Sequence, residues 1–114
     1  MLTNNNGQST AQSASSSKHD KPLSQFYLAC KEGDLQKVTR ILKTYTIDDI
    51  NRIEPHGSTA LHVASFNGHA QIVRLLLDVG AARNLLNNYG STPYEEAEKY
   101  PEIRRMFERF GKSE

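Results

Sequence analysis

The chain has 114 residues, enough for one domain. Its 14 basic and 13 acidic residues give a formal net charge of +1, so nothing in the charge favours nucleic acid or an anionic membrane as partner. No apolar run reaches the roughly 18 residues that a membrane-spanning helix needs, and the N-terminus lacks the basic and apolar regions of a secretory signal.

Residues 1–21 are rich in Ser, Asn and Gln and contain almost no large apolar side chain. Such a segment cannot bury enough surface to offset the loss of chain entropy on folding. We therefore expect residues 1–21 to form a disordered tail.

The sequence then repeats itself. NRIEPHGSTALHVA (residues 51–64) aligns with NLLNNYGSTPYEEA (residues 84–97) at an offset of 33 residues. LACKEGDLQKVTRIL (residues 28–42) aligns with VASFNGHAQIVRLLL (residues 63–77) at an offset of 35 residues. Since insertions cost least in loops, we place the two extra residues in the connection at 43–53.

Each repeat is expected to form a turn and two short helices. In the middle repeat, Thr59 is placed to cap the first helix, and Gly68 to end it with a positive φ. The second helix is AQIVRLLLDV, followed by Gly80. Its broad apolar stripe suits a helix that packs against its partner and against neighbouring repeats. The stripe comprises Ile72, Val73, Leu75, Leu76 and Val79.

The segment PEIRRMFERF is expected to form the last helix, with Pro101 at its first position, where a missing N–H costs nothing. Its apolar stripe is Ile103, Met106, Phe107 and Phe110, and the residues expected to face away are Arg104, Arg105, Glu108 and Arg109. A membrane-surface helix is the alternative, but a single apolar stripe on a last helix favours core packing.

The stretch GSTALHVASFNGHAQIVRLLLDVGA resembles the ankyrin repeat, whose pattern is a β-turn plus two helices with a T-P-L-H-x-A core. The resemblance covers about residues 22–112. It implies an all-α solenoid of paired antiparallel helices joined by β-turn or hairpin loops. The expected units are residues 22–53, 54–86 and 87–112.

The outer two units depart from the pattern and are expected to act as caps. SQFYLA replaces the core motif in the first unit, and Glu95 occupies the histidine position in the last. Capped ends and an initial Met favour a complete small domain, with a fragment as the alternative. The residues expected to shape the turns and helix ends are Gly57, Thr59, His62, Gly68, His69, Gly80, Gly90 and Thr92.

His62 is the first candidate for a catalytic residue. A catalytic role would require a nucleophile beside it and a carboxylate to orient it. The resemblance instead implies that Thr59 and His62 hydrogen-bond within and between units. A zinc site would need ligands at other spacings than those of His56, His62 and His69, which lie six and seven residues apart. We expect neither a metal nor a cofactor.

Two further groups also receive structural interpretations. Glu95 and Glu96 are adjacent, so on a helix they point about 100° apart and favour its positive N-terminal end rather than paired acid–base work. Cys30 is the only cysteine and lies where the family places a small buried residue. A lone buried thiol fits a reducing compartment, so we expect an intracellular, cytoplasmic protein. Because no group of residues forms a catalytic constellation, we expect that it is not an enzyme.

The resemblance implies that function is binding of a partner protein by the concave face, which consists of the turn tips and the ends of the first helices. The most informative residue is Phe66, because it lies away from the apolar stripe and would be a binding hot spot if exposed. The alternative is that Phe66 folds over the turn and only packs. The candidate partner-binding residues are His56, Ser58, Phe66, Asn67, Asn88, Tyr89, Lys99 and Tyr100.

Two other functions stay open. The repeats could be a regulatory or targeting segment of a larger, enzymatic protein, or the chain could be an enzyme in its own right. The second lacks a supporting group of residues. We expect a monomeric interaction module with a protein partner, no nucleic acid and no membrane insertion.

Overall fold

The computed structural model describes residues 23–111, so the predicted tail at residues 1–21 lies outside the described part. Within that part the chain is helical and has no strand, which confirms the predicted all-α solenoid. The helices are α1 (Gln25–Glu32), α2 (Leu35–Leu42), α3 (Ile47–Ile50), α4 (Ala60–Phe66), α5 (Ala70–Asp78), α6 (Pro93–Glu96) and α7 (Pro101–Gly111), with a 3-10 turn at Pro55–Gly57.

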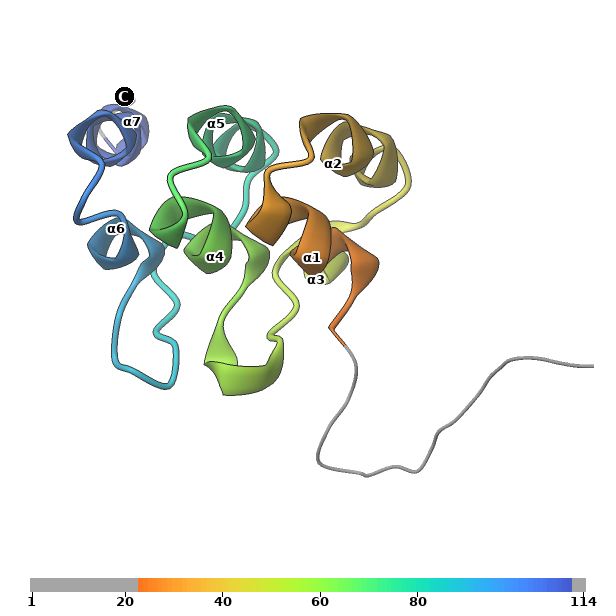
Figure 1. Cartoon of the computed structure of the whole chain (residues 1–114), viewed down its shortest axis with the longest axis horizontal. Helices are drawn as coiled ribbons and strands as arrows, with labels where there is room; N and C mark the ends of the chain where they lie inside the picture. Colours follow the sequence, from red (N-terminus) through yellow and green to blue (C-terminus); the bar gives the residue numbers. More distant parts are fainter. Residues whose placement is uncertain (1–22, 112–114) are drawn as a thin grey trace, which may run out of the picture.

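Apart from the short α3, the helices form three stacked pairs arranged in two rows (Figure 1). In one row α4 packs between α1 and α6, and in the other α5 packs between α2 and α7. The apolar core runs through all three pairs, because no pair can bury its apolar side chains alone. Its fully buried members include Val38, Leu61, Ile72, Val73, Leu76 and Ile103.

Gly68 ends α4 as predicted. It follows the last helical turn with φ of 77°, and its N–H donates to the carbonyl of Ser65 at 3.2 Å. The N–H of His69 donates to the carbonyl of Ala64 at 3.0 Å, which completes a Schellman motif. A Cβ at position 68 would lie 2.5 Å from the ring of Tyr100, so glycine also permits the next unit to approach closely.

The connection at 43–53 holds the short helix α3, which the sequence analysis did not predict. Thr46 caps this helix in a reciprocal capping box with Asp49. Ile50 is buried, and the ring of Tyr45 packs 4.9 Å from the ring of Phe26. The two-residue insertion is therefore an ordered part of the stack.

Two expectations about side-chain direction are wrong. Val79 was placed in the apolar stripe of α5 but is 39% exposed, because α5 ends at Asp78 and Leu77 fills the core instead. Arg104 was expected to face away from the stack. Its guanidinium instead lies 4.7 Å from the centre of the Tyr94 ring and donates to the Tyr94 carbonyl, since α7 crosses the end of α6.

The buried polar link between units centres on His62, which is 1% exposed. Its Nδ1 accepts from the N–H of Thr59 at 3.1 Å, and its Nε2 lies 2.9 Å from the carbonyl oxygen of Ser91 in the next unit. A backbone N–H can only donate and a carbonyl can only accept. His62 is therefore neutral, with its proton on Nε2.

The outer units have other residues than histidine at the third position after the cap of their first helix. Ser24 caps α1 by accepting from the N–H of Tyr27, and Thr92 caps α6 in a capping box with Glu95. Tyr27 and Glu95 thus occupy the position of His62. Glu95 provides the contact within the unit but no contact to a further unit in the described residues, which explains the departure from the histidine motif.

Replacing His62 by Ala should lower the free energy of unfolding by about 1–3 kcal/mol, because the Thr59 N–H and the Ser91 carbonyl lose a buried partner. Urea unfolding measures this effect. The exposed His56, replaced by Asn, is the matched control. An unchanged urea midpoint for His62→Ala would refute the structural role.

Ser65 is fully buried in α4, and its Oγ has no hydrogen-bond partner among the described residues. Ser65→Ala should therefore raise the free energy of unfolding by about 1 kcal/mol, since it removes an unpaired hydroxyl and improves helix propensity. Thr39→Ala on the exposed surface, where the Thr39 hydroxyl donates to the carbonyl of Leu35, should change it by less than about 0.5 kcal/mol. A lower urea midpoint for Ser65→Ala would contradict this prediction.

Candidate concave binding face

Two turns closed by equivalent backbone hydrogen bonds project from the stack at residues 54–58 and 87–91 (Figure 1). In each, the N–H of the first residue donates to the carbonyl of the fifth, at 2.9 and 3.0 Å. The N–H of Asn88 then donates to the carbonyl of His56 at 3.0 Å and joins the two tips. These turns and the row of α1, α4 and α6 bound the face that we call the concave face.

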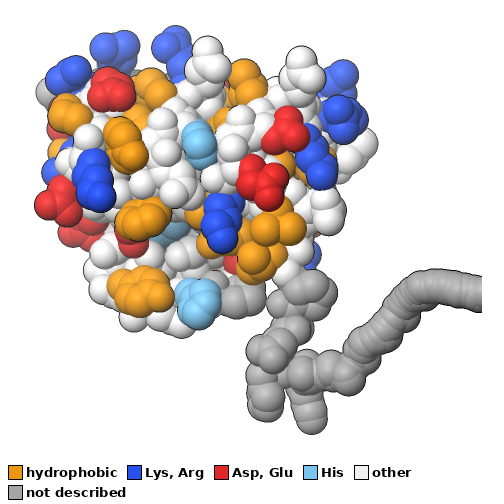
Figure 2. Space-filling model, in the orientation of Figure 1, with side chains coloured by type: hydrophobic (Ala, Val, Ile, Leu, Met, Phe, Trp, Pro, Cys, Tyr) orange, Lys and Arg blue, Asp and Glu red, His pale blue; other side chains and the backbone are white. Residues whose placement is uncertain are grey.

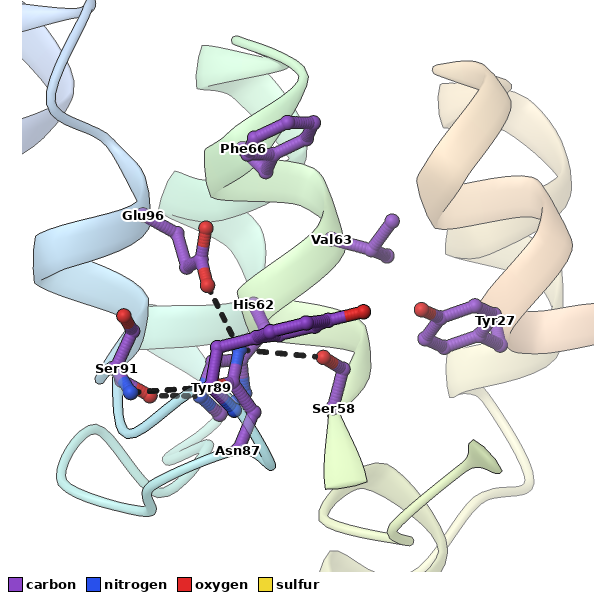
Figure 3. A pocket seen from close by; sticks show the side chains of 9 residues that line it. All are labelled: Tyr27, Ser58, His62, Val63, Phe66, Asn87, Tyr89, Ser91 and Glu96. Carbon is purple, nitrogen blue, oxygen red and sulfur yellow. Dashed lines mark hydrogen bonds between the residues drawn. The ribbon is translucent and has the colours of Figure 1, made fainter. Parts of the chain in front are cut away.

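A pocket of about 460 Å³ lies in the concave face, between these turns and the three helices (Figure 3). The side chains of Phe66 and Tyr89 are its most exposed members, at 57% and 73%. Both were predicted as partner-binding residues, and the structure brings them to one pocket. The lining residues are Tyr27, Ser58, His62, Val63, Phe66, Asn87, Tyr89, Ser91 and Glu96.

Asn87 organises one wall of this pocket and is itself buried. Its Nδ2 donates to Oε2 of Glu96 at 2.7 Å and to Oγ of Ser58 at 3.4 Å. Its Oδ1 accepts from the N–H groups of Tyr89 and Ser91, both at 3.0 Å. One amide therefore fixes the turn that carries Tyr89 and the carboxylate of Glu96.

Asn87 was not among the predicted site residues, although the repeat contains a signal for it. It stands 33 residues after Glu54, so both turns begin with a polar residue. Glu54 is also buried, and it accepts from the hydroxyl of Ser24 at 2.7 Å. The paired polar positions thus tie each turn to a neighbouring unit.

Tyr27 supplies the side of the pocket that faces α1, and sequence reasoning missed it too. The candidate partner-binding residues include none from the first unit, whose exposed Lys31 and Glu32 do not line the pocket. The signal was the position of Tyr27 three residues after the cap, as for His62. Burial raises the pKa of the Tyr27 hydroxyl, and the negative charge of Glu54 raises this pKa further.

Several predicted partner-binding residues do not line the pocket. Among the candidates, Ser58 lines it along with Phe66 and Tyr89. The others lie elsewhere on the turns or helix ends; they are His56, Asn67, Asn88, Lys99 and Tyr100. His56 is exposed on the first turn and does not line this pocket.

Asn67 and His69, which follow the end of α4, contribute to contacts between units. Asn67 donates from Nδ2 to the carbonyl of Lys31 at 3.4 Å and to that of Val63 at 3.1 Å. His69, predicted to shape the turn into α5, makes no side-chain capping bond to that helix. Its Nε2 instead lies 2.9 Å from the carbonyl of Lys31, which links the middle unit to the first.

Cys30 is a free, fully buried cysteine, and burial raises its pKa to about 12. The thiol therefore stays protonated near neutral pH and is a poor nucleophile. In the part of the chain from 23 to 111, no three His, Cys, Asp or Glu side chains come together as metal ligands would. No helix within that part has the length and apolarity to cross a membrane.

Comparison with known proteins agrees with this architecture. Residues 26–107 match the family profile for ankyrin repeats in three copies. The chain is 36% identical over 75 residues to human "NAD-capped RNA hydrolase NUDT12", which covers 66% of this chain and 16% of that protein. It is 34% identical over 83 residues to human "Protein phosphatase 1 regulatory subunit 27", which covers 71% of this chain and 53% of that protein.

A viral protein shows a similar likeness. The chain is 34% identical over 79 residues to "Ankyrin repeat protein OPG025" of vaccinia virus (strain Western Reserve), covering 65% of this chain and 12% of that protein. The chain thus spans about half or less of the length of each of these relatives. With three repeat copies matched across most of its described residues, the chain belongs to the ankyrin-repeat family.

Proposed function

We propose that this chain is a non-catalytic interaction module that binds a partner protein through its concave face. Ankyrin repeats are protein-interaction modules, and the chain has three of them. The observation that carries the proposal is the pocket in which Phe66 and Tyr89 hold largely exposed rings. Rigid aromatic side chains grouped in a pocket are typical binding hot spots, because a partner can desolvate them fully.

The surroundings of the rings favour recognition over packing. Phe66 is the last residue of α4, and more than half of its side chain is open to solvent. Tyr89 sits at the tip of the second turn, with its backbone N–H held by Asn87. Because the backbone under each ring is fixed, a partner would bind them with little ordering cost.

The groups that resemble catalytic ones support the non-catalytic part of the proposal. Both nitrogens of the His62 ring are used for hydrogen bonds to backbone groups. Cys30 is buried and protonated. A nucleophile–base pair needs an accessible attacking atom beside a free base, and neither residue offers one.

A second function is supported by the relatives. The matched segment makes up 16% of the hydrolase NUDT12 and 53% of a phosphatase regulatory subunit, by their printed names. Under this alternative, the same face belongs to a regulatory or targeting segment of a larger protein. In both cases we expect a monomeric module, and the free buried thiol of Cys30 supports an intracellular, cytoplasmic location.

The double variant Phe66→Ala/Tyr89→Ala should bind its partner at least about tenfold more weakly, since each ring is a candidate hot spot. Its free energy of unfolding should change by less than about 0.5 kcal/mol, because both rings are largely exposed. Affinity capture from cell extract with quantitative mass spectrometry identifies the partner. Calorimetric titration with the purified partner then measures the affinity.

The matched control is Val79→Ala/Leu86→Ala, which removes two exposed apolar side chains that do not line the pocket. It should leave partner binding unchanged. A large fall in the melting temperature of Phe66→Ala/Tyr89→Ala with binding retained would mean that the rings only pack.

A further inference from the structure

The pocket combines aromatic rings with a carboxylate. Phe66 and Tyr89 lie on opposite sides of its opening, with Tyr27 on a third side and Glu96 on the fourth (Figure 3). None of the lining residues is Lys or Arg. Faces of aromatic rings carry partial negative charge and attract cations. The chemistry of the lining therefore favours a positively charged group over a neutral or acidic one.

The carboxylate of Glu96 is held in place by a hydrogen bond but is not neutralised by a cation among the described residues. Its Oε2 accepts the hydrogen bond from Asn87 at 2.7 Å, and the side chain is half-buried. Among the described side chains, no Lys, Arg or His forms an ion pair with it. Burial raises the pKa of the Tyr27 hydroxyl, and the nearby negative charges of Glu54 and Glu96 raise this pKa further. Both carboxylates therefore contribute negative charge at this side of the pocket.

An arginine suits this pocket better than a lysine. A guanidinium is planar, stacks on aromatic faces, loses less hydration than an ammonium, and can bind a carboxylate with two N–H groups. The same chain shows a related arrangement where α7 meets α6, with backbone carbonyls in place of the carboxylate. There Arg104 lies 4.7 Å from the centre of the Tyr94 ring while its N–H groups donate to the carbonyls of Tyr94 and Glu95.

We propose that the pocket binds an arginine side chain of the partner protein, with the guanidinium between Phe66 and Tyr89 and hydrogen-bonded to Glu96. This inference rests on the proposed function and names the chemistry that its site selects. Lys31 and Lys99 lie at the repeat positions equivalent to Phe66 but do not line the pocket. They favour an acidic residue beside the arginine in the partner.

The probe is the peptide acetyl-Gly-Gly-Arg-Gly-Gly-amide, titrated into the full chain and followed by amide chemical shifts in NMR. The shifts should concentrate at Tyr27, Phe66, Tyr89 and Glu96. The peptide with citrulline in place of arginine keeps the shape and loses the charge, and it should bind at least about tenfold more weakly. The lysine peptide should bind roughly threefold to tenfold more weakly than the arginine peptide.

Two variants test the contacts separately. Glu96→Gln keeps an acceptor for Asn87 and removes the charge, so it should weaken the arginine peptide by roughly fivefold to tenfold. Glu98→Gln removes an exposed carboxylate outside the pocket and should leave the affinity within about twofold of wild type. Phe66→Ala should weaken the peptide by roughly threefold to tenfold through loss of the cation–π contact.

Several outcomes overturn the inference. Equal affinity for the citrulline and arginine peptides would show that the pocket does not recognise the positive charge. Tighter binding of the lysine peptide would exclude arginine as the preferred cation. A gain in peptide affinity in Lys18→Gln/Lys21→Gln would instead assign the pocket to residues 18–21 of this chain. If the arginine peptide fails while Phe66→Ala/Tyr89→Ala still abolishes capture of a partner, the inference is wrong and the proposed function stands. If capture is also unaffected, both are wrong.

Discussion

The structure depends on the bond between His62 and the carbonyl of Ser91, which joins the middle unit to the last across the base of the turns. Apolar stacking alone holds helices together but leaves the register of projecting turns open. A buried ring with one nitrogen on its own helix cap and the other on the next turn has one neutral tautomer and one orientation. The relative position of the two turns follows from it.

The pocket is a consequence of this register. The turn at 87–91 is fixed by His62 from one side and by the side chain of Asn87 from within. Since Asn87 also binds the carboxylate of Glu96, the same amide positions a ring and a charge that belong to different elements. Asn87, a turn residue, thereby sets the positions of the side chains that a partner would contact in the pocket.

The division between scaffold and recognition follows burial. The side chains that could take part in catalysis, His62 and Cys30, are buried in the stack. The rings of Phe66 and Tyr89, by contrast, are largely exposed to solvent on a fixed backbone. A small stack exposes little surface, so a few well-placed rings must supply most of the binding energy. An arginine anchor would give such a face specificity, because the half-buried carboxylate of Glu96 disfavours partners that cannot pair with it.

The sequence alone determined the fold, because glycines, helix caps and apolar spacing are local signals that recur every 33 to 35 residues. It also identified Phe66, whose apolar side chain stands off the helical stripe. It did not show that Tyr27, Asn87 and Glu96 meet in one pocket or that His56 lies outside it, since these contacts depend on how the units stack. Arg104 was misjudged for the same reason, as α7 crosses α6 there. Periodicity fixes which face of a helix is buried, whereas contacts between turns and neighbouring units are decided only when the stack forms.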